Sequence, residues 1–215
     1  MPDNPASENT STEKPEHAPR QAIRRQRRSL SLYEQQQHSE ALCQSLRKQK
    51  CYRSSRHLAC YLANDGEIDP MPLVEHAWLM KKTVYLPVLA PLQNKLYFAP
   101  YDENSTLRLN RFNIPEPDCS PALWKTARQL DLLLLPLVAF DPQGNRLGMG
   151  GGFYDRSLAY LQHRRYWRKP FLLGLAHELQ KVEKLEAQSW DIPLDGIITE
   201  KQYYPGQIDR GMFAE

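Results

Sequence analysis

The sequence predicts an α/β protein with a three-layer, Rossmann-like arrangement, in which helices cover both faces of a mostly parallel sheet and an N-terminal helical arm comes first. Residues 131–140 (DLLLLPLVAF) form the most apolar run, which is typical of a strand buried on both faces of a parallel sheet. Strand-like and helix-like segments alternate along the chain, as in layered α/β domains. With 215 residues, 41% of them hydrophobic, the chain can bury a sizeable core.

Local signals place the expected elements in order. Ser31 and Glu34 have the spacing of a capping box, and Pro72 suits the first turn of a helix. Residues 83–89 are rich in side chains that favour strands, whereas residues 100–122 contain four prolines and are expected to be irregular. We expect helices at 19–28, 31–50, 72–82, 122–128 and from 153, and strands at 57–62, 83–89, 96–99, 131–140, 171–176 and 196–199.

The chain is expected to comprise a disordered polar tail at 1–18, a single α/β domain at 19–204 and a C-terminal tail at 205–215. No apolar run is long enough for a transmembrane helix, and no secretory signal is expected because no apolar stretch follows a basic start. The cysteines at 43, 51, 60 and 119 form no CxxC pair, so we expect reduced thiols in a cytoplasmic protein.

Positive charge is concentrated near the N-terminus. Residues 1–28 carry six Lys or Arg and four Asp or Glu, while the formal net charge of the whole chain is only +3. The nearly neutral body argues against nucleic-acid binding. The expected first helix would carry on one face Arg20, Arg24, Arg27 and Arg28. That face is either solvated surface or an arm that faces an anion, such as a phosphate or RNA.

A glycine-rich loop between the apolar strand and the next helix is the most informative segment. Four of the ten glycines lie within residues 148–152. Glycine allows positive φ and close approach to a ligand, and the N–H groups that begin a helix attract anions. The loop therefore favours a phosphate site, with a tight turn as the alternative. It is neither a Walker A loop nor a dinucleotide fingerprint, since no Lys-Ser/Thr pair follows and Phe153 replaces the last glycine.

Asp155 follows in the first turn of the expected helix. It could simply offset the helix dipole. Beside phosphates, however, a carboxylate needs a cation between itself and the ligand, and Mg²⁺ takes one or two carboxylates together with phosphate oxygens. Asp155 is therefore a candidate magnesium ligand.

Residues 136–141 (PLVAFD) and 144–156 (GNRLGMGGGFYDR) closely resemble the signature of the 5-formyltetrahydrofolate cyclo-ligase (methenyltetrahydrofolate synthetase) family. Residues 65–69 (DGEID), 84–88 (VYLPV) and 190–194 (WDIPL) also resemble segments of that family. The resemblance runs from about residue 20 to about residue 200.

The resemblance implies an ATP-dependent cyclisation of 5-formyltetrahydrofolate to 5,10-methenyltetrahydrofolate. ATP would phosphorylate the formyl oxygen, N10 of the folate would attack the activated carbon, and phosphate would leave. The implied ligands are ATP and the folate, as small-molecule substrates, and Mg²⁺. A monomer without membrane or nucleic-acid partners is expected.

Site residues are carried over from the resemblance position by position. The expected ATP-binding residues are Arg20, Arg24, Arg146, Leu147, Gly148, Met149, Gly150, Gly151, Gly152, Phe153 and Tyr154. The expected folate-binding residues are Leu62, Glu67, Met149, Gly150, Gly151, Gly152 and Phe153. The expected metal ligands are Asp155 and Asp191. Glu67 could instead be a solvated turn residue, and Asp191 a turn cap.

One position departs from the family pattern. The family usually has a Lys or Arg four residues before the first arginine of the N-terminal helix, where this chain has Glu16. Either the helix register shifts and makes Arg20 and Arg24 the pair, or one ATP contact is missing. Lys14 is the nearest upstream cation that could replace it.

Three further side chains have open roles. Tyr154 and Trp190 could stack on a pterin or adenine ring, although core packing is the simpler expectation for each. His177 ends a strand and is expected to be a structural histidine.

Two other functions also fit parts of the sequence, namely RNA binding through the arginine helix and a sugar-phosphate enzyme that uses the loop without ATP.

Overall fold

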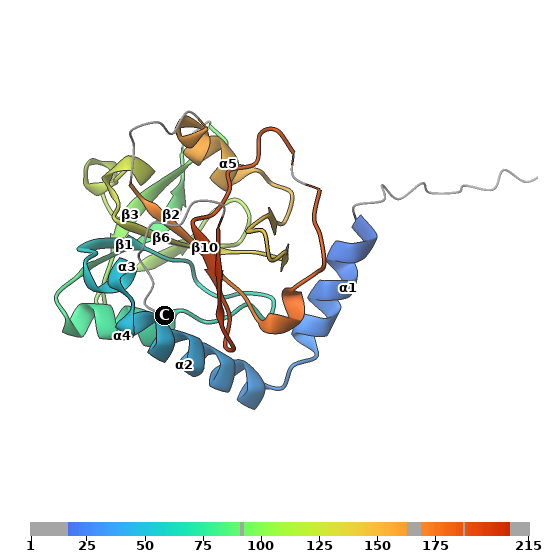
Figure 1. Ribbon diagram of the computed structural model, residues 1–215. Helices are drawn as coiled ribbons and strands as arrows, with labels where there is room; N and C mark the ends of the chain where they lie inside the picture. Colours follow the sequence, from blue (N-terminus) through green and yellow to red (C-terminus); the bar gives the residue numbers. More distant parts are fainter. Residues whose placement is uncertain (1–16, 91–92, 163–168, 187, 207–215) are drawn as a thin grey trace, which may run out of the picture.

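The computed structural model describes residues 17–90, 93–162, 169–186 and 188–206 (Figure 1). The expected tail at 1–18 lies outside the described residues except for its last two, and helix α1 (His17–Arg28) already begins there. Most of the expected C-terminal tail at 205–215 lies outside them as well.

The secondary structure follows the predicted alternation. The other helices are α2 (Leu32–Lys48), α3 (Lys50–Arg53), α4 (Met71–Leu79) and α5 (Phe153–Leu158), with 3-10 turns at Pro121–Leu123, Ala127–Gln129, Ala159–Leu161 and Glu178–Gln180. The strands are β1 (His57–Ala59), β2 (Thr83–Leu89), β3 (Leu96–Tyr101), β4 (Leu107–Leu109), β5 (Pro115–Pro117), β6 (Leu132–Pro136), β7 (Ala139–Phe140), β8 (Arg146–Leu147), β9 (Phe171–Leu175), β10 (Gly196–Ile198) and β11 (Tyr203–Pro205). None of the described helices combines the length and apolar character needed to cross a membrane.

Two local expectations are confirmed. The Ser31 hydroxyl accepts a hydrogen bond from the Glu34 amide at 3.2 Å, and the Glu34 carboxylate accepts one from the Ser31 amide at 2.8 Å, which is the predicted capping box at the start of α2. All four cysteines are free thiols.

Seven strands form one mostly parallel sheet, in the order β11-β10-β9-β6-β1-β2-β3. The five central strands run parallel, and β3 and β11 add antiparallel edges. This confirms the predicted fold class. Strand β2 has the expected bounds, whereas the strand expected at 57–62 ends three residues early, at Ala59.

Both faces of the sheet are buried, as the apolar run predicted. Leu132 and Leu134 belong to a core cluster that includes side chains of α2, α3 and α4. Leu133 and Leu135 belong to a second cluster that includes Leu158 of α5. Because successive strand residues point to opposite faces, this alternation puts helices on both sides of β6 and creates three layers (Figure 1).

The position of β1 marks the point where the strand order reverses, at the carboxyl edge of the sheet. This strand lies between β2 and β6 and runs parallel to both. Open parallel sheets bind ligands outside the carboxyl ends of their strands, at the point where the strand order reverses. In this chain, residues 60–70 follow β1, and the β7–β8 hairpin and the glycine loop follow β6.

The expected single strand at 131–140 is wrong in its second half. Strand β6 ends at Pro136, and β7 pairs instead with β8 in a separate hairpin. A proline donates no backbone hydrogen bond and so weakens continuation of the ladder. The backbone carbonyl of Leu137, the residue after β6, accepts hydrogen bonds from the side chains of Arg27 at 3.2 Å and Gln180 at 2.7 Å.

The region expected to be irregular at 100–122 contains a hairpin. Strands β4 and β5 pair antiparallel, with Leu107 opposite Pro117 and Leu109 opposite Pro115. A two-stranded ribbon leaves one edge of each strand unpaired, and proline is tolerated there. The helix expected at 122–128 is two short 3-10 turns, and strand β11 was not expected from the sequence.

Candidate active site

The glycine loop joins β8 to α5 and has backbone conformations that require glycine. Gly150 has a φ of 89°, and Gly152, the residue before α5, has a φ of 61° in the left-handed region. Other residues adopt such angles only with strain. A Cβ on Gly151 would lie 2.9 Å from the Phe153 ring, so this position lacks room for a side chain. The loop is open to solvent, and Met149 is 58% exposed.

Two arginines reach the loop from separate helices. A Cβ on Gly150 would lie 3.9 Å from Nη1 of Arg20, so α1 extends to the loop as expected. Arg156 of α5 donates from Nη2 to the Gly151 carbonyl at 2.6 Å and from Nε to the Asn94 carbonyl at 2.8 Å. Sequence reasoning missed Arg156, although it directly follows the candidate metal ligand.

Arg146 of β8 contributes a third cation at the loop. Its Nη2 lies 2.5 Å from Oδ1 of Asp155, and its Nη1 lies 3.6 Å from the position of a Cβ on Gly148. The Arg146 side chain is only 7% exposed. Its Nε is buried and has no hydrogen-bond partner among the described residues. A buried donor of this kind is uncommon in folded proteins and suits an acceptor on a ligand.

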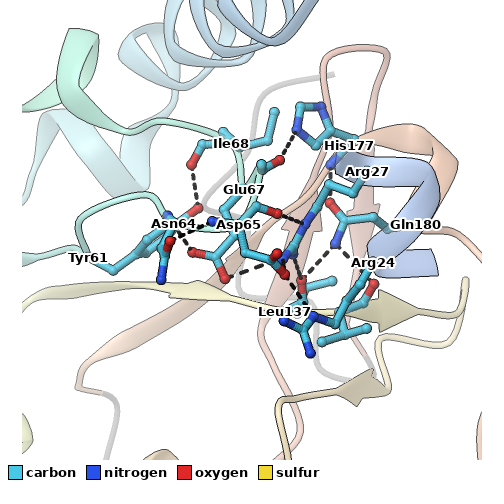
Figure 2. Close-up of polar contacts among 12 residues, drawn as sticks. Arg24, Arg27, Tyr61, Asn64, Asp65, Glu67, Ile68, Leu137, His177 and Gln180 are labelled. Carbon is cyan, nitrogen blue, oxygen red and sulfur yellow. Dashed lines mark hydrogen bonds and ion pairs between the residues drawn. The ribbon is translucent and has the colours of Figure 1, made fainter. Parts of the chain in front are cut away.

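Three further arginines of α1 converge on Asp65, in the turn after β1, and Figure 2 shows two of them, Arg24 and Arg27. The nitrogen–oxygen distances are 2.7 Å from Arg24, 2.9 Å from Arg27 and 3.0 Å from Arg28. Burial raises the pKa of Asp65, but the Arg24 hydrogen bond and the positive charges of the three arginines outweigh burial and lower it. The solvated-face alternative is wrong for Arg27, whose side chain is 1% exposed. Arg24 is held by an internal carboxylate.

Arg27 also joins the carboxyl ends of β1 and β6. Its Nε donates to the Asp65 carbonyl at 2.9 Å, and its Nη1 donates to the Leu137 carbonyl at 3.2 Å. Gln180 donates to the same Leu137 oxygen at 2.7 Å. Figure 2 shows these groups converging between α1 and the sheet. Sequence reasoning missed these contacts around Arg27, because contacts between residues so far apart along the chain produce no local pattern.

Glu67 lies where the turn after β1 approaches α5. Its Oε2 accepts from the Asn64 amide at 3.2 Å, and its side chain is 14% exposed, so it is not a solvated turn residue. Burial raises the pKa of Glu67 against the lowering influence of Arg27. Burial and the charge of Glu67 raise the pKa of Tyr61 and of Tyr154. The three side chains are therefore close enough to interact.

Glu67 also lines an open pocket of about 580 Å³ between α2, the turn after β1 and the start of α4. Its polar lining includes Gln35, Gln36, Glu40, Asn64, Glu67 and Glu75. Leu62 is not part of this lining and packs, half-buried, against the core beneath the turn. Of the two folate-binding residues expected in this segment, Glu67 therefore lines the pocket and Leu62 does not.

The other expected site residues lie in the segment before β10 and in α5. Oδ2 of Asp191 accepts from the Gln188 amide at 2.8 Å, which supports the turn-cap alternative. Neither Asp155 nor Asp191 belongs to a cluster of three or more His, Cys, Asp or Glu within the described part of the chain. Trp190 is 61% exposed, so core packing is wrong for it. Tyr154 packs against the core, as expected.

His177 is a buried structural histidine, as expected. Its Nε2 donates to the Gly66 carbonyl at 3.0 Å, and its backbone amide donates to the Gln180 side chain at 2.8 Å. Burial lowers its pKa to about 4. His177 thus fixes the turn that carries Asp65 and Glu67 from behind.

The fold and the loop together define a three-layer α/β protein with a glycine-rich, arginine-bordered loop at the carboxyl edge of its parallel strands. Residues 12–200 match the 5-formyltetrahydrofolate cyclo-ligase family, and the chain belongs to that family of enzymes. The resemblance noted in the sequence is thereby confirmed.

Individual relatives agree with this assignment. The chain is 42% identical to 5-formyltetrahydrofolate cyclo-ligase of Escherichia coli (strain K12) over 178 residues, which is 82% of this chain and 96% of the relative. It is 38% identical to the Haemophilus influenzae enzyme of the same name, over 83% of this chain and 94% of the relative. The NMR structure of Aquifex aeolicus 5,10-methenyltetrahydrofolate synthetase matches with a TM-score of 0.75 and 29% identity, over 90% and 94% of the two chains.

Proposed function

We propose that this chain catalyses the ATP-dependent cyclisation of 5-formyltetrahydrofolate to 5,10-methenyltetrahydrofolate, with release of ADP and phosphate. Family membership supports the reaction, and one observation supports its site. An exposed loop with glycine-dependent backbone is bordered by Arg20, Arg146 and Arg156, which come from three separate elements. Exposed backbone amides and converging guanidinium groups suit a polyanion such as a triphosphate.

ATP binds through the loop and its arginines in this proposal. The backbone amides of residues 148–153 contact the phosphates, with Leu147 and Tyr154 at the two ends of the loop. Arg20 and the buried Nε of Arg146 donate charge-assisted hydrogen bonds to phosphate oxygens. Helix α5 has only six residues, so its dipole adds little and the arginines supply most of the positive potential.

Arg20 is the arginine of α1 that we assign to ATP. Arg24 is engaged by Asp65 at 2.7 Å and is therefore a positioning residue for α1. Lys14 and Glu16 lie outside the described residues. The same ion pairs weaken the RNA-binding alternative, because Arg24, Arg27 and Arg28 already pair with Asp65.

The chemical step is a phosphoryl transfer followed by ring closure. The formyl oxygen attacks the γ-phosphorus, and the bond from that phosphorus to ADP breaks. N10 then attacks the formyl carbon and loses its proton, and the carbon–oxygen bond breaks so that phosphate leaves with the former formyl oxygen. Such transfers depend on positioning and charge stabilisation more than on covalent catalysis. The glycine-rich loop and the arginines that border it can provide both.

The folate is proposed to lie between the turn after β1 and the glycine loop. Leu62 and Glu67 approach it from the turn, and Met149, Gly150, Gly151, Gly152 and Phe153 approach it from the loop. The Glu67 carboxylate can accept hydrogen bonds from the N–H groups of a pterin. Because Glu67 is largely buried, a ligand donor in place of water would strengthen this interaction.

Mg²⁺ is proposed to bind at Asp155, with Asp191 as a second ligand. The donor set suits a hard cation, since carboxylate oxygens and phosphates are typical Mg²⁺ ligands. Arg146 pairs with Oδ1 of Asp155 at 2.5 Å, so Mg²⁺ would have to share or displace this contact. When bound, Mg²⁺ would neutralise charge that develops on the phosphates. We further propose a monomeric, cytoplasmic enzyme that acts only on small molecules.

Absorbance of the methenyl product tests the proposed function. Purified protein with 5-formyltetrahydrofolate, ATP and Mg²⁺ should form product, and omission of either ATP or Mg²⁺ should abolish formation. Product formation without ATP would contradict the proposal. A folded protein that forms no product with all three components present would contradict it as well.

A further inference from the structure

A second group of ligand-type side chains lies away from the glycine loop. His38 of α2, His177 after β9 and Glu200 after β10 each offer one atom, and these atoms all lie within 4.8 Å of one another. Nδ1 of His38 lies 2.9 Å from Nδ1 of His177 and 4.0 Å from Oε1 of Glu200. Among the described residues, this is the single group of three or more His, Cys, Asp or Glu that converge in this way.

Hydrogen bonding fixes the orientation of the buried histidine. The Gly66 carbonyl can only accept, so Nε2 of His177, at 3.0 Å, carries the hydrogen (Figure 2). In the neutral ring, Nδ1 then has a lone pair, and it faces His38. Metal-binding histidines typically donate their other ring N–H to a carbonyl or carboxylate in this way.

The carboxylate is oriented as well. Oε2 of Glu200 accepts from the Glu178 amide at 2.9 Å, while Oε1 is the oxygen that faces His38. The side chains of His38 and Glu200 are 26% and 9% exposed, so an ion could enter from the side of α2. His177 is fully buried and forms the inner wall.

The spacing suits a small tetrahedral ion. With metal–ligand bonds of 2.0–2.2 Å, two ligand atoms of a tetrahedral zinc site lie about 3.4 Å apart. The observed separations of 2.9 and 4.0 Å fall on either side of that value. The third separation, between His177 and Glu200, is at most 4.8 Å, so the half-exposed His38 and Glu200 would move toward the ion to bring all three donors into place.

We propose that His38, His177 and Glu200 bind a zinc-type divalent cation, with a fourth position open to water. Two imidazoles and one carboxylate select zinc over Mg²⁺, which prefers oxygen ligands. On binding, His38 moves its ring proton from Nδ1 to Nε2, so both Nδ1 lone pairs face the ion. This site is separate from the glycine loop and does not rest on the proposed function.

Calorimetric titration with Zn²⁺ in excess Mg²⁺ tests the proposal, because Mg²⁺ saturates sites made only of oxygen. All proteins carry Cys119→Ser, which removes the one cysteine that is not buried. The variants are His38→Ala and Glu200→Gln, with His57→Gln as a matched histidine control that lies outside the cluster. Thermal unfolding without metal confirms that each variant folds. Co²⁺ absorption provides a second readout, since nitrogen ligation at a site of low symmetry gives a visible band.

The expected result is one Zn²⁺ per chain, an affinity at least about tenfold weaker in His38→Ala and in Glu200→Gln, and unchanged binding in His57→Gln. The Co²⁺ band should be lost in His38→Ala. Lack of zinc binding would show that the two imidazoles share only a hydrogen bond and would overturn the proposal. Unchanged affinity in either cluster variant, or an equal loss in His57→Gln, would also overturn it.

Discussion

At the scale of residues, the glycines of the loop are required for different reasons. Gly150 and Gly152 have φ values of 89° and 61°, whereas Gly151 is needed because a Cβ would meet the Phe153 ring at 2.9 Å. The density of glycines predicted a special backbone. The sequence could not assign these separate reasons, because they depend on the backbone angles of the folded loop and on the position of the Phe153 ring.

Gly150→Ala is expected to weaken ATP binding about tenfold in a folded protein. An alanine at this φ costs about 1–3 kcal/mol or shifts the loop, and Arg20 and the phosphates both depend on the loop's position. Calorimetric titration with ATP measures the change. Gly144→Ala is the control, because Gly144 has a φ of 85° in the β7–β8 turn, so the same strain should reduce stability and leave ATP affinity unchanged. Equal ATP affinity in Gly150→Ala and wild type would remove the loop from ATP binding.

Arg20→Ala should raise the Michaelis constant for ATP about tenfold or more. A charge-assisted hydrogen bond to phosphate contributes about 1.5–3 kcal/mol. Arg25→Ala is the matched control, since Arg25 is an exposed arginine of the same helix. Steady-state kinetics at saturating folate give the comparison. If both variants keep the wild-type constant, α1 does not contact ATP.

At the scale of elements, α1 is attached to the sheet by charge more than by apolar packing. Its arginines meet Asp65, and Arg27 continues to the end of β6. The periodicity of the arginines predicted correctly that they share a helix face. It could not reveal that one carboxylate pairs with three of these arginines, because the partner is Asp65, 38 residues beyond Arg27.

Asp65→Asn should lower the free energy of unfolding by about 3 kcal/mol, because it removes the nearer of the two carboxylates that pair with the buried Arg27 and leaves only Glu67, at 3.8 Å. Asp118→Asn is the control, since Asp118 pairs with Arg108 on the surface and should change stability by less than about 1 kcal/mol. Urea unfolding at neutral pH measures both.

The ion pair between Asp65 and Arg27 also makes the stability of the protein depend on pH. The pKa of Asp65 is lower in the folded state than in the unfolded state, where it is about 3.9. As the pH falls below about 4, the unfolded state takes up the proton first, so the stabilisation by Asp65 decreases. The stability difference between wild type and Asp65→Asn should therefore shrink in acid. A difference that stays constant from neutral pH to pH 3 would contradict this assignment.

Asp155→Asn tests the element that follows the loop. If Asp155 holds Mg²⁺, the Mg²⁺ concentration for half-maximal activity should rise about tenfold, while the protein remains folded. If Asp155 only pairs with Arg146 and offsets the dipole of α5, the Mg²⁺ concentration for half-maximal activity should stay unchanged. Only the stability of the folded protein should then fall. Activity as a function of Mg²⁺, with thermal unfolding alongside, distinguishes the two roles.

At the scale of the whole molecule, the fold was predictable because its central strands are continuously apolar. Leu132 to Leu135 alternate between the two core clusters, which is what a sheet covered on both faces requires. The edges were less predictable. Strand β11 and the β4–β5 hairpin are short and contain prolines, so their pairing depends on neighbours that the sequence does not identify.

The candidate site was predictable only where its residues are contiguous. The loop from Gly148 to Asp155 forms one motif, and the resemblance to the family identified it. The contacts that complete the site, such as Arg27 with Leu137 and His177 with Gly66, join segments more than 100 residues apart. Such contacts follow from the parallel strand order, which brings the carboxyl ends of β1 and β6 together.

Transfer of the formyl oxygen is the most direct test of the proposed reaction. If 5-formyltetrahydrofolate labelled with ¹⁸O in the formyl group is converted with unlabelled ATP, mass spectrometry of the released phosphate reports where the oxygen goes. Phosphorylation of the formyl oxygen predicts one labelled oxygen in inorganic phosphate for each methenyl group formed, and none in ADP. Product formation with unlabelled phosphate would contradict the account, because the oxygen would then have left by a route that does not pass through the γ-phosphate.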